Sequence, residues 1–89
     1  MSYNIVNFEL EISKYLESLD LKEITKKSYA KILTTFTRYL KVRFILLPSK
    51  KDILDYKEHL AKSVRSASIQ KTIVVLRGFF TYLDSEGIY

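Results

Sequence analysis

The side chains able to do chemistry in this 89-residue chain are mostly cations, and they are concentrated in one stretch. Residues 22–43 contain seven Lys or Arg side chains and a single acid. On a helix of 100° per residue, the apolar residues gather around Phe36. The opposite side carries Lys27, Lys31, Thr34, Arg38 and Lys41. A face of one sign lacks the ion pairs that support exposed helices, and it suits a polyanion such as a phosphate backbone. We call Lys27, Lys31, Arg38 and Lys41 the basic ridge.

A second feature of the same stretch is its start. Thr25, Lys26 and Lys27 fall in the first turn of the expected helix, beside backbone N–H groups that have no partner within the helix. Such a helix N-terminus is a favourable position for a phosphate oxygen. The sequence therefore indicates anion binding at the beginning of this helix as well as along its polar side.

Catalytic and metal-binding residues are scarce. The chain has no cysteine, and His59 is its only histidine. A lone surface histidine is usually inert, and without thiols a transition-metal site is improbable. The two glycines, Gly78 and Gly87, stand too far apart to form a phosphate-binding loop. We expect no catalytic residue, no metal and no cofactor in this chain, which should bind rather than catalyse.

Length and charge indicate one small basic domain covering residues 1–89. A chain of this size buries roughly 60–65% of its unfolded surface, enough for one core. Residues 1–23 have a net charge of −3 and residues 24–89 a net charge of +8, which sum to +5. No signal peptide and no apolar run long enough for a membrane span is evident, so we expect a soluble, cytoplasmic protein without membrane contact.

Hydrophobic spacing predicts an all-α fold of four helices with short connections. The expected helices cover residues 5–19, 22 or 23 to 42, 49–62 and 67–85. In the first helix, Glu9, Glu11 and Glu17 are expected to face outward. The segment 44–47 (FILL) is expected to plug the core, and Ser49 with Asp52 resembles a capping box that opens the third helix.

The last helix is apolar on nearly all sides, so we expect it to be central and buried. Val74 is expected to help cover the buried surface, and Arg77 to lie at the rim of the core. Gly78 should permit close approach of another helix, and Gly87 is expected to cap the C-terminus.

Three segments together resemble the core-binding domain of tyrosine recombinases, the family that includes phage-type integrases and Xer-like recombinases. They are TKKSYAKILTTFTRYL (25–40), LPSKKDILDYKEHL (47–60) and SIQKTIVVLRGFFTYLDSEGIY (68–89). Each motif is weak by itself, and the block formed by Leu76, Arg77, Phe79 and Phe80 with Gly87 is the most specific. The match covers most of the chain in the correct order.

This resemblance implies a SAM-like orthogonal four-helix bundle that, together with a separate C-terminal catalytic domain of the same parent chain, clamps double-stranded DNA. It also implies a homotetramer on DNA in the full-length protein, with the first helix touching a neighbouring protomer. Through matching positions in the motifs, the resemblance adds residues of the second and last helices to those expected to bind DNA. The full set is Thr25, Lys26, Lys27, Lys31, Arg38, Lys41, Ser66, Ser68, Gln70 and Lys71.

The family's catalytic residues lie in the domain that this chain lacks, so the fragment should not cleave DNA, whereas its parent should be a recombinase or integrase. If Met1 is the native start, a simple Xer-like or transposon-type parent is favoured over a lambda-like one. Gln70 could read adenine and Lys71 guanine, although phosphate contact is the commoner role.

Two alternatives remain open from the sequence. The first is a helical protein–protein interaction module, in which the basic ridge serves solubility or an acidic protein partner. The second is a helix-turn-helix regulator, which would need a tight turn between two short helices. The link near Arg65 instead joins a helix to a long, buried one.

Overall fold

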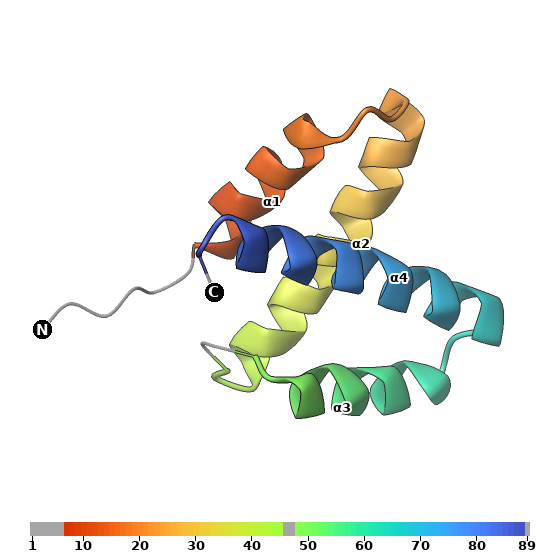
Figure 1. The fold of residues 1–89 in the computed structure, drawn as a ribbon. Coiled ribbons are helices and arrows are strands. Elements are labelled where there is room, and N and C mark those ends of the chain that lie inside the picture. The colour runs from red at the N-terminus through yellow and green to blue at the C-terminus, as the bar shows by residue number, and fades with distance from the viewer. Residues whose placement is uncertain (1–6, 46–47, 89) are drawn as a thin grey trace, which may run out of the picture.

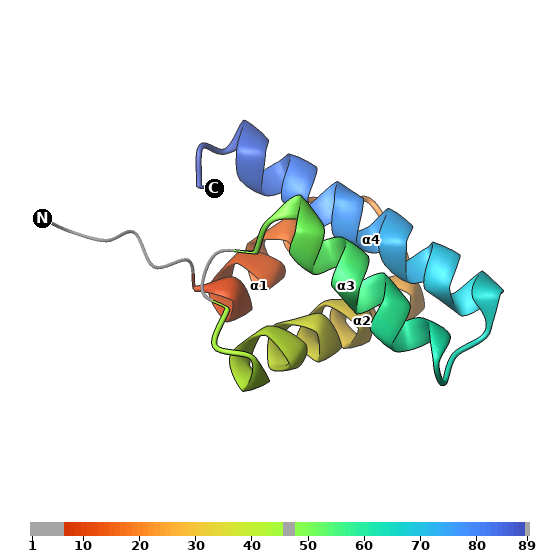
Figure 2. The same ribbon diagram turned by 90° about the horizontal axis from the view of Figure 1, so that it is seen from below.

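The computed structural model describes residues 7–45 and 48–88 of the chain. They form four helices, α1 (Phe8–Ser18), α2 (Glu23–Val42), α3 (Lys50–Ala61) and α4 (Ser66–Ser85), and no strand occurs within these ranges. Figure 1 shows α1 and α2 as one antiparallel pair, with α4 crossing α2. The view from below in Figure 2 shows α3 and α4 running side by side. The expected all-α, four-helix fold is confirmed.

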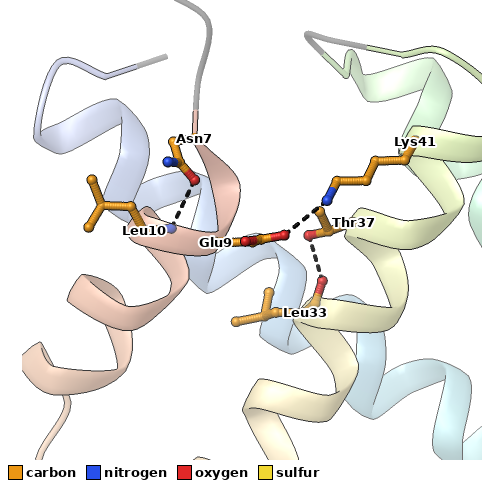
Figure 3. Close-up of polar contacts among 6 residues, drawn as sticks. All are labelled: Asn7, Glu9, Leu10, Leu33, Thr37 and Lys41. Atoms are coloured by element: carbon orange, nitrogen blue, oxygen red, sulfur yellow. Dashed lines mark hydrogen bonds and ion pairs between the residues drawn. The ribbon is translucent and has the colours of Figure 1, made fainter.

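Local polar contacts explain where two of the helices, α1 and α3, begin. At α1, the Asn7 Oδ1 accepts a hydrogen bond from the Leu10 N–H at 3.2 Å (Figure 3). The described helix therefore starts at Phe8, and the expectation of a start at residue 5 concerns a residue outside the described ranges. At α3, the predicted capping box is present, with the Ser49 N–H donating to the Asp52 Oδ2 at 2.7 Å. Each cap satisfies a backbone group that the helix itself leaves unpaired.

The core forms where α4 meets the other three helices. Leu76, Phe79 and Leu83 of α4 are at most 1% exposed, and Leu33 and Phe36 of α2 at most 2%. Burying each such side chain stabilises the fold by about 1.5–3 kcal/mol. The central position expected for the last helix is confirmed. Although α2 and α4 each contain 20 residues, no helix in the described ranges is apolar enough over its length to cross a membrane.

Three expectations about side-chain burial are wrong. Val74 is 64% exposed and Arg77 is exposed, because the buried side of α4 is centred on Leu76 and Phe79. Glu11 does not face outward with Glu9 and Glu17. It is only 8% exposed, and within the described part of the chain its Oε1 has no hydrogen-bond partner.

The two glycines have the roles expected of them. Gly87 has φ 69°, and the Ile88 N–H donates to the Leu83 carbonyl at 2.9 Å, which closes the C-terminus of α4. Gly78 lies against Tyr15 of α1. A Cβ atom at residue 78 would be 2.5 Å from the Tyr15 Oη, so the missing side chain allows this contact between α1 and α4.

The expectation that residues 44–47 plug the core is wrong at Phe44. Its side chain is 90% exposed and its φ is 58°, in the left-handed region that bulky residues avoid. The Ile45 N–H donates to the Leu40 carbonyl at 2.9 Å, which places Phe44 at the position where glycine usually ends a helix. Of the two described residues in this segment, Ile45 packs against the core. The expectation for Leu46 and Leu47 concerns residues outside the described ranges.

The Gly78 contact predicts a coupling between two substitutions. Gly78→Ala in a helix interior would normally stabilise by about 1 kcal/mol, but here the new Cβ meets the Tyr15 hydroxyl. We expect the gain only when Tyr15→Phe removes that oxygen, as measured by urea unfolding of the four members of the double-mutant cycle. An equal gain in both backgrounds would show that Tyr15 moves aside without cost.

The backbone at Phe44 predicts a stabilising glycine. Phe44→Gly should raise the free energy of unfolding by about 0.5–1 kcal/mol, because glycine enters the left-handed region without steric cost and the exposed ring loses no packing. Phe44→Ala is the matched control, since it removes the ring and keeps the strained conformation. Thermal or urea unfolding checks both, and equal stability of the two variants would contradict the backbone explanation.

Candidate nucleic-acid interface

The basic ridge lies on the solvent side of α2. All four of its residues are exposed. Leu33, Phe36 and Leu40 on the opposite side of the helix are at most 2% exposed. Their burial fixes the rotation of α2 about its own axis. The packing of α2 therefore keeps the ridge turned toward water.

One ridge residue has an acidic partner that the sequence did not indicate. The Lys41 Nζ donates to the Glu9 Oε1 of α1 at 2.9 Å, across a groove of about 430 Å³ between α1 and α2 (Figure 3). The Glu9 and Lys41 side chains are 75% and 66% exposed, so the ion pair is open to solvent and adds at most about 1 kcal/mol. The expectation of a face without acids therefore fails at Lys41.

The other three ridge residues are free of ion pairs with any described acid. Lys27 lines a shallow depression near Glu17 and Glu23, at the end of α2 that lies beside α1, without a salt bridge to either. Lys31 and Arg38 have no acidic partner within the described ranges. The unpaired part of the ridge is thus its middle and its N-terminal end.

A hydrogen bond connects the predicted DNA-binding residues of α4 to α2. The Lys71 Nζ donates to the Ser28 Oγ at 2.8 Å, which joins the first turns of α4 to the N-terminal half of α2. Ser28 lies one turn before Lys31 on the surface of the helix. Two segments 43 residues apart in the chain therefore meet beside the ridge.

The remaining predicted residues divide into two groups. Ser66, Ser68 and Gln70 are exposed in the first turns of α4, which begins at Ser66 without a side-chain cap. Thr25 and Lys26 are half-buried in the first turn of α2, and Lys26 faces Glu17 of α1 across the shallow depression. The α4 residues are accessible on the surface, whereas Thr25 and Lys26 lie off the ridge.

Sequence reasoning missed a second groove, between α2 and α3, whose lining includes Arg38, Tyr39, Arg43, Tyr56 and His59. The Arg43 Cζ lies 4.6 Å from the centre of the Tyr39 ring. Burial, and secondarily the nearby Tyr39, raises the pKa of the Tyr56 hydroxyl above its usual value. The spacing of Tyr39 and Arg43, one helical turn apart, was the available signal in the sequence.

Within residues 7–45 and 48–88, no three His, Asp or Glu side chains are grouped so that they could hold a metal ion. What the arrangement presents chemically is a row of ammonium and guanidinium groups on α2, with the Lys71 ammonium of α4 hydrogen-bonded to Ser28 beside it. Such a surface can neutralise phosphate oxygens.

Comparison with known proteins gives one match. The family model described as "Phage integrase, N-terminal SAM-like domain" matches residues 12–87, from within α1 to the C-terminal cap of α4. Searches of curated proteins and of solved structures each gave no significant match. The chain therefore belongs to the family of phage integrase N-terminal SAM-like domains, which associates it with site-specific recombination.

Proposed function

We propose that this chain is the core-binding domain of a site-specific tyrosine recombinase and that it binds duplex DNA through the basic ridge and the first turns of α4. The observation that supports this most directly is the contact between Lys71 and Ser28. It joins the first turns of α4 to α2, the helix whose solvent side carries the basic ridge.

The dimensions of the ridge suit a phosphate backbone. Lys27 and Lys41 are 14 residues apart, which is about 21 Å along a helix axis. Duplex DNA carries about one negative charge per 1.7 Å of its axis. The four ridge residues and Lys71 can therefore neutralise roughly five phosphates, so most of the affinity comes from the DNA backbone. Recognition of the DNA base sequence is then shared with a catalytic domain elsewhere in the parent chain.

The proposal includes the further expectations taken from the sequence. The domain comprises residues 1–89, the parent protein cleaves and rejoins DNA as a homotetramer, and it works in the cytoplasm where its DNA is found. Ser66, Ser68 and Gln70 contact phosphate or base edges from α4, and Thr25 and Lys26 contribute through the N-terminus of α2.

Charge reversal on the ridge tests the proposal. We expect Lys27→Glu with Arg38→Glu to abolish binding to a fluorescent duplex measured by anisotropy, since both side chains are exposed and the fold should survive. Binding of the unaltered protein should fall with salt at a log–log slope of about −4 to −5. The matched control is Lys51→Glu with Lys57→Glu on α3, which changes the net charge equally.

Two outcomes would contradict this proposal. Equal loss of affinity in the ridge and control variants would show that only net charge matters. Anisotropy that does not rise with any duplex at low salt would favour the protein–protein interaction module. Circular dichroism of each variant confirms that the helices remain.

The ion pair between Glu9 and Lys41 predicts an effect of the opposite sign. Glu9→Gln frees the Lys41 ammonium for phosphate and removes a repelling carboxylate, so duplex affinity should rise by a few-fold at low salt. The control is Glu58→Gln, an exposed acid on α3 that changes the net charge in the same way. If the two variants bind DNA equally, Lys41 does not take part in the interface.

A further inference from the structure

The groove between α2 and α3 is not used by the duplex interface, apart from sharing Arg38 with the ridge. Its volume is about 580 Å³, which falls within the range of about 300–1,000 Å³ seen for small-molecule sites. Tyr56 of α3 is buried and forms part of its floor, and Tyr39 of α2 is half-buried on the opposite wall. The groove is open to solvent along the exposed His59 side chain.

Ring faces dominate the lining of this groove. The Tyr39 ring centre lies 4.7 Å from that of Tyr56 and 5.2 Å from that of His59. The Tyr56 and His59 rings are nearly parallel, at 19°, with their centres 6.2 Å apart. Tyr39 is tilted by 45° to His59 and by 56° to Tyr56, so the three rings form a cluster and not one flat surface. Its exposed member, His59, is available for another flat group to stack upon.

The charged groups of the groove have one sign. Arg43 already stacks on Tyr39 at 4.6 Å, and Arg38, five residues earlier in α2, also lines the groove. None of the lining residues in the described part of the chain is an acid, and neither guanidinium has an ion pair there. A guanidinium group can donate two parallel hydrogen bonds to two oxygens of one phosphate. When it stacks on an aromatic ring, its N–H donors remain free to bind such an anion.

We propose that this groove binds single-stranded DNA, with a base stacked against His59 and the adjoining phosphate held by Arg38 and Arg43. Aromatic faces combined with a cationic groove are the arrangement by which proteins bind unpaired strands. A paired duplex shows only the edges of its bases in its grooves and cannot reach a ring face. This inference rests partly on the proposed function, because Arg38 belongs to both the groove and the ridge. A strand bound in the groove would continue from Arg38 onto the ridge.

A comparison of two short single strands tests the base-stacking part of the proposal. We expect a fluorescent thymidine oligonucleotide to bind about tenfold more tightly than an abasic strand of equal length and charge, as measured by anisotropy. His59→Ala should remove most of this preference, whereas His59→Phe, which keeps a ring, should retain it. Lys57→Ala is the matched control, because Lys57 is exposed on α3 and does not line the groove.

A second variant tests the phosphate contact and separates the two proposals. Arg43→Ala should weaken binding of both strands, and it should leave duplex binding nearly unchanged because Arg43 is not on the ridge. Lys27→Glu with Lys31→Glu should abolish duplex binding while the ratio between thymidine and abasic strands persists. Failure of the duplex arm alone would therefore overturn the proposed function without touching the groove.

Three results would overturn the groove proposal. They are equal affinity for thymidine and abasic strands, retention of the preference in His59→Ala, and binding of an acidic aromatic peptide at His59 with no binding of either strand. The last result would identify a protein partner instead. Circular dichroism and thermal unfolding of each variant show that a loss of binding is not a loss of fold.

Discussion

The packing of α2 against α4 is the constraint on which the rest of this structure depends. Leu33, Phe36 and Leu40 contribute one side of that contact, and Leu76 and Leu83 lie within the same buried core. Because these side chains are almost completely removed from water, rotating α2 would expose several of them at about 1.5–3 kcal/mol each. The core thus determines which residues of α2 face solvent, and the basic ridge is the consequence.

The acidic first helix modifies this surface. By packing beside α2, α1 brings Glu9 to Lys41 and Glu17 to the depression that holds Lys27. The Glu11 carboxylate of α1 is buried, and the Lys14 Nζ lies 3.9 Å from its Oε2. Carboxylates beside the ridge weaken its field locally, and solvent screens their effect because the Glu9 and Lys41 side chains remain largely exposed. Lys31 and Arg38 have no acidic partner within the described ranges.

The two surfaces discussed above differ in chemistry. The ridge offers cations on a convex helix face and suits a continuous phosphate backbone. The groove between α2 and α3 offers ring faces flanked by guanidinium groups and suits an unstacked base. Arg38 lies where the two surfaces adjoin.

The sequence by itself determined the helices, most of their bounds and the sides of α2, because spacing of apolar residues and capping groups are local properties of the chain. It also predicted the roles of Gly78 and Gly87 and the exposure of the ridge. It did not predict the pairing of Lys41 with Glu9, the contact of Lys71 with Ser28, the burial of Glu11 or the exposure of Phe44. Each of these depends on how two segments distant in the chain meet, or on how a helix end directs the backbone. Only the tertiary structure decided them, because periodicity gives the direction of a side chain from its own helix axis and contains no information on which other helix lies there.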